Sequence, residues 1–306
     1  MKRFKSAEIK QFVSIPLFEE NIILIKNSSY PKISIVTPSY NQAEFLERTI
    51  LSILNQNYPN LEYIIVDGGS TDKSLEIIKK YEKYISYWIS ETDNGQSDAI
   101  NKGFRIATGD IVGWQNSDDI YLPNAFFKIA EEYKKYPYYD VYFGNLITID
   151  YIDKIINEIR YSPFSLNCLL YEGWNITNQT TFFKNNIIKE YPLKENYKYA
   201  MDADLYVRLG IDKRKFKFVR DFLGCLRFHN NTKTAAISSS TGIKEWEQIR
   251  RASGVVVKDD TAWDKQYAIK RLKCFLRRFM LYAIQADFDY IFTGFIRRTK
   301  KFLKVL

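Results

Sequence analysis

Short apolar runs alternate with helical patterns through the first third of this 306-residue chain, and this alternation limits the folds open to it. The runs are rich in β-branched and aromatic residues and cover 33–37 (ISIVT), 61–67 (LEYIIVD), 84–90 and 111–114 (IVGW). Between them, apolar residues recur at helical spacing, as in 96–107. Runs without polar alternation are typical of parallel strands buried on both faces. The pattern predicts an open, mainly parallel α/β sheet.

The regular alternation of predicted strands and helices ends at about residue 137. Segments 140–150 (DVYFGNLITID) and 154–162 (KIINEIRYS) alternate like antiparallel strands. We expect a helix near 200–210, a pair of strands near 216–229, and a long helix entered from 237–242. No stretch is rich enough in Pro, Gly or Ser to act as a linker, so one continuous domain is predicted.

The net charge of +9 is concentrated at one end of the chain. Residues 265–306 hold eleven Lys or Arg and only two acids, so this tail alone accounts for the excess and residues 1–264 are balanced. A protein that binds nucleic acid through a globally basic surface is therefore disfavoured, and no nucleic-acid partner is expected.

Cysteine usage and hydropathy bear on location. The three cysteines, Cys168, Cys225 and Cys274, follow no metal-ligand or redox spacing, which favours a reducing compartment. No stretch approaches the roughly 18 uninterrupted apolar residues of a membrane-spanning helix. We expect a cytoplasmic protein.

Acidic and small residues follow the ends of the four predicted strands. The loops are 37–41 (TPSYN), 67–72 (DGGSTD), 91–95 (ETDNG) and 116–119 (NSDD). Ligands of open α/β sheets bind beyond the carboxyl ends of the strands, and oxygen ligands suit a hard cation. The loops therefore predict a pocket that holds a cation. Each loop alone is equally well explained by helix caps and turns, for which Asp, Asn and Gly are suited.

Two long segments carry a resemblance to a known family. They are 33–72 (ISIVTPSYNQAEFLERTILSILNQNYPNLEYIIVDGGSTD) and 91–119 (ETDNGQSDAINKGFRIATGDIVGWQNSDD). They resemble the family 2 glycosyltransferases of the GT-A fold, and the resemblance runs from about Lys32 to about Ala236. It implies an α/β fold with a mainly parallel nucleotide-binding sheet flanked by helices and a smaller antiparallel acceptor part. It also implies a nucleotide-sugar donor, a divalent metal and inversion at the anomeric carbon.

The resemblance assigns donor-binding roles to eight positions. Pro38 and Tyr40 match positions that pack around the base, and Asp67 matches the acid that accepts a hydrogen bond from it, typically from uracil. The residues that match the part framing ribose, diphosphate and sugar are Asp93, Gln96, Asp98, Lys102 and Ser117. Lys102 could offset phosphate charge or be a solvated helix lysine.

The segment Asn116-Ser117-Asp118 occupies the place of the family's DxD signature, with an amide replacing the first acid. Asp118 matches the acid that contacts the metal, expected to be Mn²⁺ or Mg²⁺. Asp119 assists it or caps the helix beginning near Pro123. His229 is the only histidine and resembles a position that closes over the donor phosphates and can touch the metal; a structural hydrogen-bonding role is the alternative.

Segment 199–209 (YAMDADLYVRL) matches the helix that bears the catalytic base, and Asp202 aligns with the base. The family usually has an acid where this chain has Met201, which would make the surroundings of Asp202 more apolar and raise its pKa. Asp204 is expected to pair with Arg208 one turn on. Trp174 and Gln179 fall where the family lines the acceptor cleft; Trp174 is also explained as a core residue.

The predicted organisation is an N-terminal extension (1–31), a GT-A catalytic domain (32–236), a helix packed on it (237–264) and a basic amphipathic helical tail (265–306). The predicted function is transfer of a sugar, hexosyl or N-acetylhexosaminyl, from a nucleotide sugar, expected to be a UDP-sugar. The acceptor would be a hydroxyl of a glycan or lipid-linked glycan in bacterial surface-polysaccharide synthesis. A catalytically weak or inactive sugar-nucleotide-binding protein is the alternative, favoured by Asn116 and Met201. A nucleotidyltransferase is disfavoured because TPSYNQ is neither Gly-rich nor basic.

Two helical stripes distinguish the tail. The first contains Leu272, Phe275, Leu276, Phe279 and Ala283; the second contains Phe292, Phe295, Ile296, Phe302 and Leu303. Basic amphipathic helices of this kind lie on anionic bilayers, so a peripheral position at the inner face of the cell membrane is expected. The stripes could instead pack on the catalytic domain or on a second subunit of a homo-oligomer.

Overall fold

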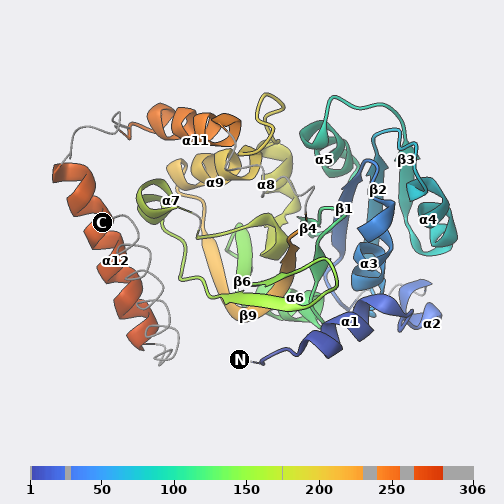
Figure 1. The fold of residues 1–306 in the computed structure, drawn as a ribbon. Coiled ribbons are helices and arrows are strands. Elements are labelled where there is room, and N and C mark those ends of the chain that lie inside the picture. Colours follow the sequence, from blue (N-terminus) through green and yellow to red (C-terminus); the bar gives the residue numbers. More distant parts are fainter. Residues whose placement is uncertain (1, 25–28, 174, 230–239, 256–264, 285–306) are drawn as a thin grey trace.

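The computed structural model describes residues 2–24, 29–173, 175–229, 240–255 and 265–284, and its centre is one sheet with helices on both faces (Figure 1). The strands lie in the order β3-β2-β1-β4-β8-β6-β9-β5, with β7 beside β6. Their bounds are β1 (Ile33–Ser39), β2 (Leu61–Asp67), β3 (Tyr87–Ser90), β4 (Ile111–Trp114), β5 (Ile120–Tyr121), β6 (Val141–Ile149), β7 (Ile155–Ile159), β8 (Thr181–Lys184) and β9 (Phe216–Arg227).

The N-terminal half of the sheet is parallel, as the sequence predicts. Strand β1 pairs with β2 on one side and β4 on the other, and β2 pairs with β3, all in parallel. The connecting helices are α3 (Ala43–Leu54), α4 (Ser74–Lys80) and α5 (Gln96–Ile106). Every residue of β1, β2 and β4 is buried, which explains their unbroken apolar character.

Each face of the sheet has its own apolar core. Neighbouring residues Ile35 and Val36 of β1 belong to different cores because successive strand side chains point to opposite faces. Helices α3, α4 and α6 (Ala125–Lys135) cover one face. The other face packs against α5, α7 (Leu166–Glu172), α8 (Asn185–Glu190) and α9 (Met201–Ile211).

The second half of the sheet is partly as predicted. Strands β6 and β7 are antiparallel, as expected. The predicted pair of strands near 216–229 is wrong, because 216–227 forms the single twelve-residue strand β9. This strand runs parallel to β6 with shifts of register around Asn145, and its far end pairs with β5. The irregular pairing bends β9 where the sequence suggests a turn.

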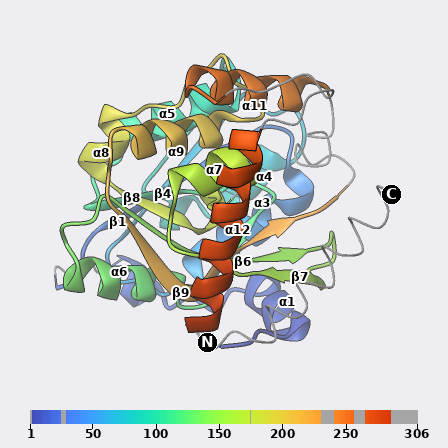
Figure 2. The ribbon, with the colours of Figure 1, turned by 90° about the vertical axis from the view of Figure 1, so that its left-hand side faces the viewer.

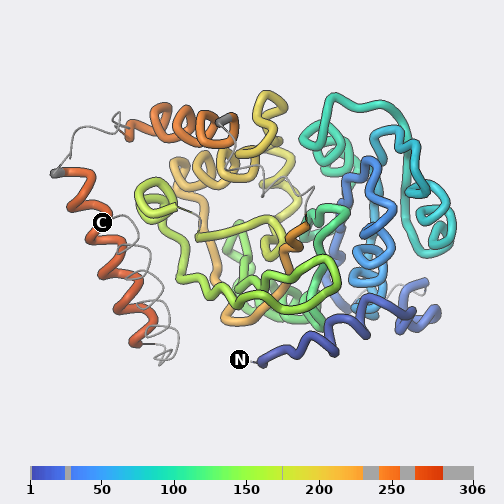
Figure 3. Tube along the Cα trace, viewed as in Figure 1, coloured from blue at the N-terminus to red at the C-terminus, as the bar shows by residue number. Residues whose placement is uncertain are grey.

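The N-terminal segment packs against the domain. Apolar residues of α1 (Ser6–Ser14) join those of β5, β6 and β9 in a third core, and α2 (Glu20–Leu24) follows. Asn55, which ends α3, donates its Nδ2 to the carbonyls of Phe12 (2.5 Å) and Ile15 (3.0 Å). Figure 3 shows this blue segment running beneath the sheet.

Two helices follow the sheet. Helix α11 (Ser240–Ala252) buries Ile249 in the core beside α9, and α12 (Lys265–Ile284) packs against α7. Neither of these, nor any other helix in the described part of the chain, combines the length and the apolar character needed to cross a bilayer.

Strand β9 passes so close to the short helix η2 (Asn178–Thr180) that only glycine fits at the crossing. A Cβ on Gly224 would lie 2.2 Å from the carbonyl oxygen of Gln179, a backbone atom that cannot rotate away. The same crossing brings the side chain of Gln179 to the carboxyl end of β4, where the candidate site lies.

We expect Gly224→Ala to lower the free energy of unfolding by about 1–3 kcal/mol, since η2 must move away from β9. Gly210→Ala, within α9, is the matched control. Its Cβ would meet only side-chain atoms, at 3.1 Å and beyond, and alanine is the better helix former. Chemical unfolding of both variants measures the difference, and equal stabilities would contradict the proposed steric limit at Gly224.

Candidate active site

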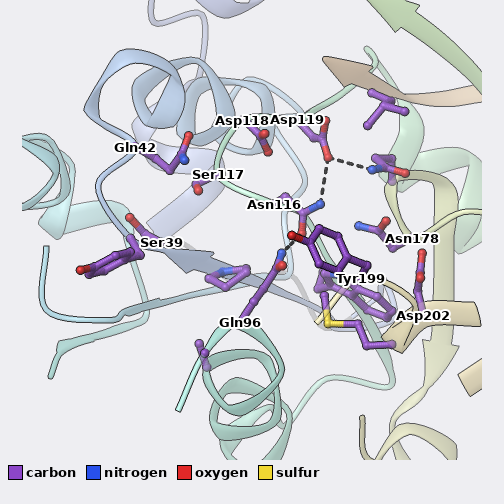
Figure 4. Close-up of a pocket in the computed structure, with 18 of the residues that line it drawn as sticks. Ser39, Gln42, Gln96, Asn116, Ser117, Asp118, Asp119, Asn178, Tyr199 and Asp202 are labelled. Carbon is purple, nitrogen blue, oxygen red and sulfur yellow. Dashed lines mark hydrogen bonds between the residues drawn. The ribbon is translucent and has the colours of Figure 1, made fainter. Parts of the chain in front are cut away.

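A cavity of about 860 Å³ opens at the carboxyl ends of the parallel strands. Its wall combines the loops after β1, β2, β3 and β4 with η2 and the start of α9 (Figure 4). Strands β6, β7 and β9 add the apolar side chains Leu146, Ile159 and Leu226. The position beyond the strand ends agrees with the general rule for open α/β sheets.

Five of the eight predicted donor-binding residues line this cavity: Pro38, Tyr40, Asp93, Gln96 and Ser117. Tyr40 is 60% exposed, so its ring is free to cover a planar ligand. Asp93 packs so closely on Gly68 that a Cβ there would lie 2.6 Å from its Oδ2.

Asp67 does not line the cavity. It is fully buried at the end of β2 and accepts hydrogen bonds from four donors of its own chain. These are the backbone N–H groups of Gly69 (3.1 Å) and Ser70 (2.8 Å) and the hydroxyls of Ser70 (2.6 Å) and Ser90 (2.7 Å). These hydrogen bonds give Asp67 a structural role in the turn after β2. They do not support the predicted contact between Asp67 and the base.

Asp98 and Lys102 also lie outside the cavity lining. The Nζ of Lys102 is 2.8 Å from a carboxylate oxygen of Glu91 and 3.4 Å from one of Asp98. Asp98 in turn accepts the backbone N–H of Asn94 (3.1 Å). These ion pairs hold α5 to the loop after β3, and they explain Lys102 without a phosphate partner.

Asn116 forms the centre of a chain of hydrogen bonds across the cavity wall. Its Oδ1 accepts from Nε2 of Gln96 (2.8 Å), and its Nδ2 donates to Oδ2 of Asp119 (3.1 Å), as the dashed lines in Figure 4 show. Asp119 also accepts from Nε2 of Gln179 (2.8 Å) and from the backbone N–H of Arg227 (2.9 Å). An amide fits at position 116 because it can both donate and accept a hydrogen bond. A carboxylate there could not donate to Asp119 and would be repelled by its carboxylate.

Asp119 is 1% exposed, so its carboxylate is shielded from solvent within the wall of the site. Burial, with the neighbouring Asp118 as the second cause, raises the pKa of Asp119. The residue does not cap α6, whose N-cap is Asn124. Through its hydrogen bonds, Asp119 connects Asn116, Gln179 and β9 beside Asp118. Any assistance to Asp118 is therefore structural.

Asp118 and His229 are the residues that could hold a metal. Oδ2 of Asp118 is 3.1 Å from Nε2 of His229, whose ring rests on Phe45 with 4.4 Å between centroids. Asp118 lines the cavity, whereas His229 is not among the lining residues. Within the described ranges, no third His, Cys, Asp or Glu joins them. One carboxylate and one imidazole fit Mn²⁺ or Mg²⁺ when diphosphate oxygens and water complete the shell.

Asp202 lies in the first turn of α9 and lines the cavity at a place well separated from Asp118 (Figure 4). Burial raises its pKa to about 7, partly opposed by the backbone N–H of Ala203, which donates to Oδ1 at 2.9 Å. This is the predicted direction. Met201 is buried beside it, and its sulfur accepts the hydroxyl of Ser97 at 2.8 Å.

Asp204 points away from the cavity, as expected. Its carboxylate accepts from Nε of Arg208 (2.7 Å), the predicted partner, and pairs with Nζ of Lys194 (3.0 Å). These contacts give Asp204 a structural role.

Glu245 of α11 fixes the start of α9, and the sequence gives no signal for it. Its buried carboxylate accepts the backbone N–H groups of Lys198 (3.0 Å), Tyr199 (2.9 Å) and Ala200 (3.0 Å). A carboxylate at this position satisfies the backbone N–H of the N-cap residue Ala200 and of the two residues before it, and it complements the helix dipole. It thereby holds the part of the wall formed by Lys198, Tyr199 and Asp202.

Four buried polar atoms in the described lining have no hydrogen-bond partner within the protein: Ser39 Oγ, Trp114 Nε1, Asn178 Nδ2 and Gln179 Oε1. A buried polar atom without a hydrogen-bond partner costs free energy. Gln179 lines the cavity as predicted, whereas Trp174 lies outside the described residues. Asn178, which belongs to the same run as Gln179, also lines the cavity, and Tyr161 was not anticipated.

Comparisons with known proteins agree with this geometry. Residues 34–191 match the family model "Glycosyl transferase family 2". An uncharacterised glycosyltransferase of Haemophilus influenzae is 30% identical over 213 residues, which cover 61% of this chain and 84% of the relative.

Two solved structures share the fold. TarS 1-349 of S. aureus in complex with UDP-GlcNAc has a TM-score of 0.59 at 17% identity, covering 81% of this chain and 73% of TarS. The mannosyltransferase PcManGT of Pyrobaculum calidifontis, in complex with GDP-Man and Mn²⁺, has a TM-score of 0.56 at 16% identity, covering 89% and 76%. The sheet and its flanking helices are those of the GT-A fold, and the chain belongs to glycosyltransferase family 2.

Proposed function

We propose that this glycosyltransferase is an inverting enzyme that moves a hexosyl or N-acetylhexosaminyl group from a UDP-sugar to a hydroxyl of a glycan or lipid-linked glycan. The observation that carries the proposal is one cavity with Asp118 and Asp202 at separate places in its wall (Figure 4). His229 contacts Asp118 at 3.1 Å. A metal-binding pair suits the leaving diphosphate, and a separate carboxylate suits the attacking hydroxyl.

The donor is proposed to enter between the loops after β1 and β4. Tyr40 and Pro38 would cover the base, and the diphosphate would face Asp118. A bound divalent metal would neutralise the developing charge of the leaving diphosphate. A UDP-sugar is supported by the likeness to TarS, whose structure contains UDP-GlcNAc.

Asp202 is proposed as the general base that takes the proton of the acceptor hydroxyl as it attacks the anomeric carbon. A pKa of about 7 suits this role, because an efficient base is half ionised near the working pH. Asn178 and Gln179 line the cavity, and their amide groups are of a kind suited to acceptor hydroxyls. A glycan acceptor, as in bacterial surface-polysaccharide synthesis, would present hydroxyl groups to this part of the cavity wall.

The first test is donor binding. A thermal-shift screen of UDP- and GDP-sugars with Mn²⁺ should show stabilisation by a UDP-sugar, and hydrolysis of that sugar should release UDP. Binding without any release of UDP would favour the inactive sugar-nucleotide-binding protein instead.

Asp202→Asn should reduce UDP release from the donor by roughly 100-fold or more, since it removes the base. Donor affinity by calorimetry should stay unchanged. Glu195→Gln, an exposed acid near the same helix, is the control. Full turnover by Asp202→Asn would overturn the assignment of the base.

The raised pKa of Asp202 also predicts a dependence of stability on pH. The fold favours the protonated acid, so it loses stability as pH rises from the unfolded value of about 3.9 to the folded value of about 7. Asp202→Asn should therefore melt above the wild type at about pH 8 and close to it at about pH 4. Thermal unfolding at both pH values checks this, and a variant less stable at the higher pH would contradict it.

Asp118→Asn should weaken the Mn²⁺-dependent part of UDP binding by about tenfold or more, because the cation loses its only carboxylate ligand from the described protein. His229→Gln should have a smaller effect in the same direction. Glu91→Gln is the control, since Glu91 pairs with Lys102 outside the cavity lining. Calorimetry with and without Mn²⁺ measures both, and unchanged metal dependence in Asp118→Asn would exclude its role.

A further inference from the structure

Helix α12 has one face committed to the protein. Cys274 and Tyr282 are buried on it, and the hydroxyl of Tyr282 donates to the carbonyl of Arg160 (2.7 Å). The guanidinium of Arg278 binds Glu172 of α7 at 2.9 Å. Figure 2 shows α12 lying across α7. These contacts make α12 a fixed part of the catalytic domain.

The opposite face is apolar and open. Six large side chains on it are between 47% and 81% exposed: Ile269, Leu272, Leu276, Phe279, Met280 and Ile284. Their spacing of three and four residues places them on one side of the helix. No other helix in the described ranges exposes more than one large apolar side chain. Three members of the predicted stripe, Leu272, Leu276 and Phe279, thus face outward, whereas Phe275 and Ala283 are half-buried.

The charge of α12 has a single sign. Its sequence contains six Lys or Arg and no acid. Lys273 is exposed and lies beside the apolar side chains by its helical position. Lys270 is also exposed, but its Nζ donates to the hydroxyl of Tyr171 in α7 (2.8 Å). If two copies met through this face about a two-fold axis, equal basic helices would oppose each other. An anionic surface matches both the charge and the apolar strip.

We propose that the outward face of α12, defined by those six apolar side chains, docks the protein on an anionic membrane. The helix lies in the plane of the surface, with its apolar side chains among the acyl chains and Lys273 at the headgroups. Its other face carries the catalytic domain through α7. The proposal does not depend on the assigned reaction, and it would place the cavity close to acceptors carried by lipid.

The test is flotation of the full chain with vesicles of phosphatidylglycerol and phosphatidylcholine, and with vesicles of phosphatidylcholine alone. The wild type should float with the anionic vesicles and be released by salt. Leu272→Asp combined with Phe279→Asp should lower the partition coefficient at least roughly tenfold, since two large apolar side chains leave the bilayer.

Ile156→Asp combined with Tyr138→Asp is the matched control, because both residues are 56% exposed and neither lies on α12. The control adds the same charge and should float like the wild type. Melting temperatures and donor binding should be alike in all three proteins. Equal flotation of the two double variants would overturn the proposal, as would a wild type that ignores anionic vesicles. A dimer that dissociates in the α12 variant, with vesicle binding unchanged, would show that a second copy covers this face.

Discussion

The candidate site depends on one buried cation, the guanidinium of Arg227, at the end of β9. It is fully buried and pairs with Asp153, in the turn between β6 and β7, at 2.7 Å. Its Nε donates to the carbonyl of Asp118 (2.8 Å), and its backbone N–H donates to Asp119 (2.9 Å). A buried charge without a partner is costly, so β9, this turn and the loop after β4 are stable only together. Arg227 therefore connects the end of β9 to the loop that carries Asp118 and limits where the carboxylate of Asp118 can lie.

The parallel half of the sheet could be predicted from the sequence because its signal is local. Unbroken β-branched runs such as 33–37 and 61–67 are required by burial on both faces. The second half depends on pairing between distant segments. Strand β8 has only four residues, TFFK, and no strand is predicted there from the sequence; it forms by pairing with β4 and β6. Strand β9 reads as two strands because its irregular register with β6 is a property of the pair.

The predictions for the site divide in the same way. Asp118 and Asp202 follow from their places in the chain, one after a strand and one in the first turn of a helix, and both line the cavity. Asp67 and Lys102 have equally suggestive positions, but serines around the first and acids around the second occupy their polar groups. The role of Glu245 has no local signal, because its three backbone partners precede it by 45 to 47 residues.

The two departures from the family pattern have structural reasons that leave the proposed chemistry intact. Asn116 donates to Asp119 and accepts from Gln96, so an acid there would place two carboxylates within hydrogen-bonding distance in a buried wall. Met201 is buried and takes the hydroxyl of Ser97, a contact that an ionised acid could make only at a large desolvation cost. Both residues line the cavity together with Asp118 and Asp202, and both make hydrogen bonds within its wall. The substitutions therefore argue for a site with fewer charges and not for one that has lost its reacting groups.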